Sequence, residues 1–157
     1  MDAQSEKVLA QLIRETRIAS LATLRDEAPQ ASMVAYLPTG DFSVFYIFAS
    51  RLAQHTVDMQ KDKRVSLLIC ETDDGREDPQ TLARVSIRGT AEVIQNGEPG
   101  YTRLKQAYLE RFPEAEKLFS LTDFNFWRIT PKGGRYVAGF AKAYNITAET
   151  LVKVSKR

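Results

Sequence analysis

The residues best suited to chemistry lie together where one apolar segment ends and a helix is expected to begin. Ser50 and Arg51 follow the apolar segment 45–48, and His55 comes one helical turn after Arg51. The free N–H groups of a helix start, a hydroxyl and a guanidinium can together bind a phosphate, because all of them donate hydrogen bonds. The pattern therefore outlines a phosphate site. The simpler alternative to a phosphate site is that Ser50 only caps the helix and Arg51 lies exposed to solvent.

Placing these side chains together requires a strand, a helix and a second strand in quick succession. The apolar residues at 45–48 and 65–69 predict two buried strands, and residues 52–60 predict the helix between them. The first of the two strands, which ends at 48, is expected to begin at 43. The other predicted strands are a β-hairpin over 18–24 and 30–37, a strand over 84–94, and closing strands over 124–129 and 135–140 joined by a turn at 130–134. The other predicted helices cover 5–15, 101–111, 116–119 and 148–152.

Many short strands joined mostly by turns favour a mainly β (α+β) fold over a parallel sheet. The expected architecture is a small antiparallel barrel with flanking helices. A length of 157 residues and a hydrophobic content of 43% suit one domain that spans residues 1–157. No shift of composition marks a linker, so we expect no second domain.

The charge balance excludes some classes of partner. There are 22 basic and 20 acidic residues, and the net charge of +2 gives no overall attraction to nucleic acid or to a membrane surface. The chain has no bilayer-length apolar run and no signal pattern at its N-terminus, so we expect it in the cytoplasm. The single cysteine, Cys70, rules out an internal disulfide and is expected to be a buried structural thiol. The acidic run 71–79 is expected to be a solvated loop and not a metal site.

Two motifs carry a resemblance to a known family. The segment 50–56, SRLAQHT, followed by the segment 62–68, DKRVSLL, resembles the FMN-binding split barrels related to pyridoxamine 5'-phosphate oxidase. The resemblance implies a six-stranded antiparallel split β-barrel, an FMN phosphate held by Ser50 and Arg51, and a homodimer that shares each flavin across its interface. Under this hypothesis further contacts to the flavin come from Ser32, Ala49, His55, Thr56 and Arg84. Ser32 replaces an arginine of the family, which removes one charge from the expected phosphate site.

A second resemblance separates the chain from true pyridoxamine phosphate oxidases. Their closing strand carries Trp-Gln-Gly and an Arg-Leu-His segment, whereas the matching stretch here reads VAGFAKAY. The segments 50–56, 123–124 and 139–143 together look like the HugZ/HutZ-type haem-utilisation branch of the same barrels. That branch binds haem through a histidine in the C-terminal tail, supported in some members by an aspartate that matches Asp123. The tail of this chain has no histidine. His55 is the only histidine in the whole sequence.

Three functions remain open. The first is an FMN-dependent oxidoreductase that acts on a small-molecule substrate, with the chemistry performed by the flavin and no side chain assigned as catalytic. The second is a haem-binding or haem-degrading protein, in which the iron is bound by His55 or by a cysteine, tyrosine or methionine. The third is a barrel with a regulatory or storage role and no flavin, which the loss of the family arginine at Ser32 favours.

Overall fold

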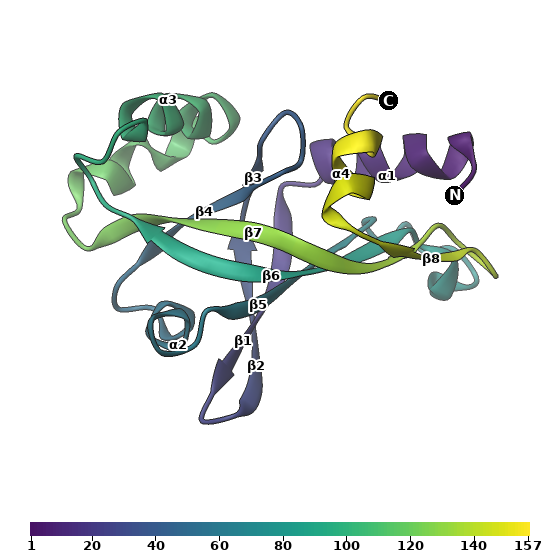
Figure 1. Cartoon of the computed structure of the whole chain (residues 1–157), viewed down its shortest axis with the longest axis horizontal. Helices are drawn as coiled ribbons and strands as arrows, with labels where there is room; N and C mark the ends of the chain where they lie inside the picture. Colours follow the sequence, from purple (N-terminus) through teal and green to yellow (C-terminus); the bar gives the residue numbers. More distant parts are fainter.

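The computed structural model describes all 157 residues, and one curled antiparallel sheet forms the middle of the molecule (Figure 1). Its strand order is β2-β1-β5-β6-β7-β4-β3, and β8 pairs with β7. The strands are β1 (Ile18–Arg25), β2 (Ala28–Ala35), β3 (Leu37–Pro38), β4 (Phe45–Ser50), β5 (Arg64–Cys70), β6 (Arg84–Ile94), β7 (Phe124–Val137) and β8 (Ala143–Ile146). The helices are α1 (Ala3–Glu15), α2 (Gln54–Lys61), α3 (Tyr101–Arg111), α4 (Ala148–Val154) and the 3-10 helices η1 (Pro79–Thr81) and η2 (Pro113–Ser120). The expected mainly β fold with flanking helices is confirmed. The sheet has six longer strands, β1, β2, β4, β5, β6 and β7, as the resemblance implies, and the two short strands β3 and β8 in addition.

Alternate residues of the long strands fill the inside of the curled sheet. Val65, Leu67 and Ile69 of β5 and Val85 and Ile87 of β6 are all buried, as a period of two requires. α1 and α4 lie together over one end of the sheet, and α3 lies over the other end (Figure 1). A second, largely aromatic cluster packs between the α3–η2 region and the outer side of β4 and β7. The helices therefore close the two ends and leave part of the outer sheet face uncovered.

One expectation about the sheet is wrong. The sequence predicts two closing strands separated by a turn at 130–134, but β7 is a single strand over its whole length. A β-bulge replaces the turn, with Lys132 as the extra residue opposite the Arg88–Gly89 step of β6. The glycines allow a close approach of two strands, since a Cβ on Gly134 would lie 2.0 Å from the carbonyl oxygen of Ser86. The proline and glycines that look like a turn thus serve a bulge and a backbone contact.

The helices follow the predicted segments; α3 has its predicted bounds, and the ends of α1, α2, α4 and η2 are shifted by one to three residues. α2 begins at Gln54, two residues after the predicted start. The short helix expected from 116 is the 3-10 helix η2, which begins at Pro113. No helix of the chain combines the length and the apolar content needed to cross a membrane.

Candidate functional site

The corner between β4 and α2 is held by Asp123, which directly precedes β7. The Ser50 hydroxyl donates a hydrogen bond to the Asp123 carboxylate (2.6 Å), and the Arg51 N–H donates to the Asp123 carbonyl oxygen (2.6 Å). The Ser50 hydroxyl oxygen also accepts the N–H of Leu52 (3.0 Å). Ser50 therefore shapes the corner, and its predicted role as the N-cap of the helix is wrong.

The first turn of α2 has no side-chain cap. Its N-cap residue is Ala53, which offers no side-chain acceptor. The N–H groups of Gln54 and His55 have no partner within the chain, because helix bonding begins with the N–H of Thr56. Arg51, just before this turn, is exposed and forms no ion pair. Two N–H groups and one guanidinium are thus free to bind an anion.

A phosphate at Ser50 itself fits this corner poorly. The hydroxyl that the family resemblance assigns to the FMN phosphate already donates to the carboxylate of Asp123. A doubly charged phosphate at that hydroxyl would lie close to the carboxylate, and like charges at short range repel each other. An anion at the corner can therefore bind Arg51 and the first N–H groups of α2, but not the hydroxyl of Ser50.

His55 is held by Ser32 on β2. The Ser32 hydroxyl oxygen and His55 Nδ1 are 3.2 Å apart, so one ring nitrogen is engaged and Nε2 has no partner within the chain. The side chain is half-buried, and burial lowers its pKa from the usual value of 6.5, while the charge of Asp58 acts in the opposite direction. Burial thus favours the neutral form of the His55 ring. When Nδ1 carries the proton and donates to the Ser32 hydroxyl oxygen, Nε2 keeps the lone pair that binds a metal ion.

Asp58, which no sequence motif singles out, anchors α2 to β1. Its side chain is 2% exposed and accepts hydrogen bonds from the Thr23 hydroxyl (2.8 Å), Arg25 Nε (3.1 Å) and the Gln54 side-chain amide (3.2 Å). The hydrogen bond from Arg25, with help from the other two donors, holds the pKa of Asp58 below its usual value. The anchor fixes the helix turn that carries His55.

Two of the expected contact residues are buried. Ala49 is part of the main hydrophobic core, and Thr56 is 1% exposed. The hydroxyl of Thr56 has no hydrogen-bond partner. In this conformation neither side chain faces a ligand at the corner.

Arg84 lies far from the other expected contacts. It pairs with Val137 at the last residue of β7, whereas Ser50 pairs with Phe124 at the first. A strand of 14 residues spans roughly 40 Å. The guanidinium of Arg84 donates to two carbonyl groups at η1. Within one copy of the chain, Arg84 and the corner do not meet at the same ligand.

Comparison with known proteins places this fold in a family. Residues 5–138 match the family described as pyridoxamine 5'-phosphate oxidase. The chloroplastic heme oxygenase HOZ of Arabidopsis thaliana is 34% identical over 116 residues, which are 74% of this chain. The chain spans only 34% of the length of that protein. The heme oxygenase HutZ of Vibrio cholerae is 23% identical over 154 residues, 97% of this chain and 86% of that protein.

The solved structures agree with the sequence matches. A heme binding protein of Mycobacterium smegmatis has a TM-score of 0.84 and 25% identity, covering 98% of this chain and 62% of that one. The family match extends over strands β1 to β7, which include the β4–α2 corner and the bulge of β7. Both resemblances expected from the motifs are confirmed. The chain belongs to the pyridoxamine 5'-phosphate oxidase family of split barrels, alongside the HugZ/HutZ-type haem-utilisation proteins.

Proposed function

We propose that this protein binds haem at the corner between β4 and α2, with Nε2 of His55 as the ligand of the iron. The observation that carries the proposal is the His55 ring, which has one nitrogen bonded to Ser32 and the other nitrogen without a partner, in a half-buried place that favours its neutral form. His55 is also the only histidine in the chain. This geometry favours His55 over a cysteine, tyrosine or methionine ligand.

The residues beside His55 suit the rest of a haem molecule. Leu52 is 86% exposed and offers apolar surface to the porphyrin ring. Arg51 has no ion pair and can hold a propionate through two parallel hydrogen bonds. Both lie within three residues of the start of α2, whose first turn carries His55. Apolar surface, a free cation and a metal ligand at one place match the three chemical parts of haem.

The relatives favour haem breakdown as the reaction. Two of them are named heme oxygenases, and a third protein of this fold is named as heme binding. Haem is then the substrate of an oxidative ring opening, which needs oxygen and an external reductant. In this proposal the chain binds the ring, orients it through Arg51 and holds the iron through His55.

A haem titration followed by visible absorption tests the proposal. We expect wild-type protein to give the Soret band of histidine-ligated haem, and the His55→Gly variant to lose it. Added imidazole should restore the band in this variant, because it can occupy the space that the ring leaves. Lys61→Ala, at the other end of α2, is the matched control. An unchanged spectrum in His55→Gly would remove His55 as the ligand, and no Soret shift in wild type would remove haem binding itself.

Breakdown is measured separately from binding. Haem-loaded protein is incubated with oxygen and a reductant, and the loss of the Soret band and the appearance of open-chain products are followed. Free haem under the same conditions is the control. Equal rates with and without the protein would leave binding as the function and exclude breakdown.

Flavin binding is the second candidate, favoured by Arg51 and the free N–H groups at the start of α2. Bound FMN would supply hydride or electron transfer, as expected for an oxidoreductase. FMN affinity should fall at least about tenfold in Arg51→Ala, because a hydrogen-bonded charge contributes about 1.5–3 kcal/mol. Asp123→Asn should strengthen FMN binding, because it removes a like charge beside the phosphate. Unchanged affinity in both variants would exclude this corner as the phosphate site.

We also propose that two copies pair through the outer face of β1, β2 and β5. Ile18, Met33 and Leu68 are 53%, 66% and 39% exposed. They lie close together, because Ser20 pairs with Met33 on one side and with Leu68 on the other. An exposed apolar group of this kind is typical of an interface between subunits. Pairing would also allow Arg84 of one copy to contact a ligand at the β4–α2 corner of the other copy.

A further inference from the structure

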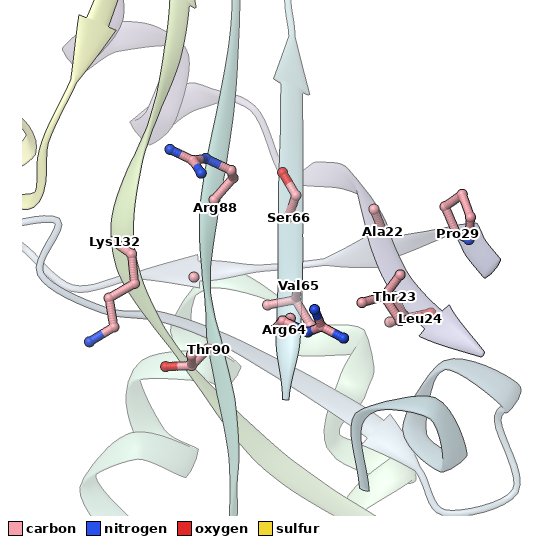
Figure 2. Close-up of a pocket in the computed structure, with 11 residues that line it drawn as sticks. Ala22, Thr23, Leu24, Pro29, Arg64, Val65, Ser66, Arg88, Thr90 and Lys132 are labelled. Atoms are coloured by element: carbon pink, nitrogen blue, oxygen red, sulfur yellow. The ribbon is translucent and has the colours of Figure 1, made fainter. Parts of the chain in front are cut away.

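The cavity on the outer face of the sheet, whose lining residues Figure 2 shows, adjoins the proposed interface between two copies. One of these residues, Ser66, lies two residues before Leu68 on β5 and shares its face. A partner seated on Leu68 and Met33 would cover this cavity. A second cavity lies away from that face, between α3 and the β3–β4 hairpin.

One face of α3 forms the first wall of this second cavity, which we call the α3 groove. The helix residues that line it are Gly100, Arg103, Leu104 and Ala107. Residues with this spacing follow one another along a single side of a helix. They extend over roughly 10 Å, because each helical residue adds 1.5 Å. The groove is therefore an elongated slot beside α3, with a volume of about 310 Å³.

The β3–β4 hairpin forms the opposite wall of the α3 groove. Leu37 of β3 and Tyr46 of β4 pair with each other, and both line the groove. The turn between the two strands is fixed by Asp41, whose carboxylate accepts the hydroxyls of Thr39 (2.7 Å) and Ser43 (2.7 Å). The wall is thus preformed, as is usual for ligand sites.

One end of the α3 groove is positively charged. Arg103 is exposed and forms no ion pair. The N–H groups of Thr102 and Arg103 have no partner within the chain, because helix bonding begins with the N–H of Leu104. No carboxylate lines the groove, and the nearest acidic residue in the chain, Glu98, accepts the N–H of Gln95. A guanidinium and two N–H groups are therefore free for one anion.

The α3 groove is separate from the corner and from the proposed interface. On β4, Tyr46 and Ser50 lie roughly 13 Å apart, because four residues of a strand separate them. Phe48 lies between them and packs into the aromatic cluster under α3. Leu37 is likewise four residues, roughly 13 Å of extended chain, beyond Met33. A ligand in the groove contacts neither His55 nor the interface residues.

Size and polarity restrict the ligand of the α3 groove. Ligand pockets range from roughly 300 to 1,000 Å³, so a volume of about 310 Å³ suits a small molecule and not haem or a flavin. Leu37, Leu104 and Ala107 make most of the length of the slot apolar. A narrow apolar slot with one cationic end is complementary to a short alkyl chain that carries one negative charge.

We propose that the α3 groove is a second ligand site, which binds a small aliphatic monocarboxylate. The alkyl chain lies between α3 and the hairpin, along Leu104 and Ala107. The carboxylate lies at Arg103 and the first N–H groups of α3. The shape of the slot and its charge complementarity argue for this class of ligand, and the site does not depend on haem binding at His55.

The test uses octanoate as the probe, because it combines an unbranched alkyl chain with one carboxylate. 1-Octanol has the chain without the charge, and acetate has the charge without the chain. Binding is followed through the amide chemical shifts of isotope-labelled protein. We expect saturable shifts at Gly40, Gly100 and Leu104, and at least about tenfold weaker binding of 1-octanol and of acetate. Shifts confined to other parts of the chain, or equal affinity for octanoate and 1-octanol, would overturn the proposal.

Two variants separate the charge of the α3 groove from its apolar slot. Arg103→Gln should weaken octanoate binding at least about tenfold, and it should fold normally because the side chain is exposed and has no ion pair. Ala107→Leu should weaken binding similarly by filling the slot, with no change of charge. Lys156→Gln, which removes one exposed cation elsewhere, is the matched control. Wild-type affinity in Arg103→Gln would overturn the proposal, even if Ala107→Leu proved unstable.

Discussion

Replacing Asp58 by alanine should destabilise the protein and loosen the helix turn that carries His55. The carboxylate is 2% exposed and is the acceptor for Thr23, Arg25 and Gln54 at once. Its removal leaves the Thr23 hydroxyl, in a residue only 3% exposed, without an acceptor. Arg25 is 39% exposed, so water can replace its lost partner.

The size of the effect follows from these exposures. Removing one member of a fully buried ion pair costs about 3–5 kcal/mol. The partial exposure of Arg25 reduces this figure, and the stranded hydroxyl of Thr23 contributes about 1–3 kcal/mol. We expect a loss of roughly 2–3 kcal/mol in the free energy of unfolding. For a chain of this length the loss corresponds to a Tm lower by about 4–12 °C.

Thermal and urea unfolding of Asp58→Ala measure this loss, with Asp74→Ala as the matched control. Asp74 also pairs with an arginine, Arg76, but its side chain is 57% exposed. An exposed ion pair contributes little to stability, so the control should unfold close to wild type. If Asp58→Ala and Asp74→Ala have the same Tm within about 2 °C, the buried network does not anchor α2.

Three other expectations follow from the fold. In the same unfolding assay, Gly134→Ala should destabilise the protein by about 3 kcal/mol or more, because its Cβ would lie 2.0 Å from the carbonyl oxygen of Ser86. Gly40→Ala should have little effect, because its Cβ would have no atom within 4 Å. The lowered pKa of Asp58 adds stability above the unfolded value near 3.9, which is lost as pH falls through the folded pKa. The urea midpoint of wild type should therefore fall more steeply below about pH 4 than that of Asp58→Asn, and parallel curves would contradict this. Met33→Glu should give a monomer in light scattering where wild type gives a dimer, and a dimeric variant would place the interface elsewhere.

Much of the local structure follows from the sequence because hydrophobic periodicity acts over a few residues. The strand at 84–94 and the helix at 101–111 are predicted with their observed bounds. The opening helix is predicted two residues short at its start. The turn at 130–134 is predicted wrongly, because proline and glycine mark a bulge and a turn alike. Only the pairing of β6 with β7 distinguishes the two, since close strand approach depends on a neighbour far away in the chain.

The candidate site at the β4–α2 corner also has one part that follows from the local sequence and one part that does not. Its local part, Arg51 and His55 around the first turn of a helix, follows from residue type and spacing. The hydrogen-bond partners of the site do not follow from local spacing. Ser50 is bonded to Asp123, 73 residues later, and His55 to Ser32, 23 residues earlier. The sequence by itself thus determined the family and the residues of the corner. The tertiary structure alone decided that the serine faces a carboxylate and that one histidine nitrogen stays free, because strand register sets those neighbours.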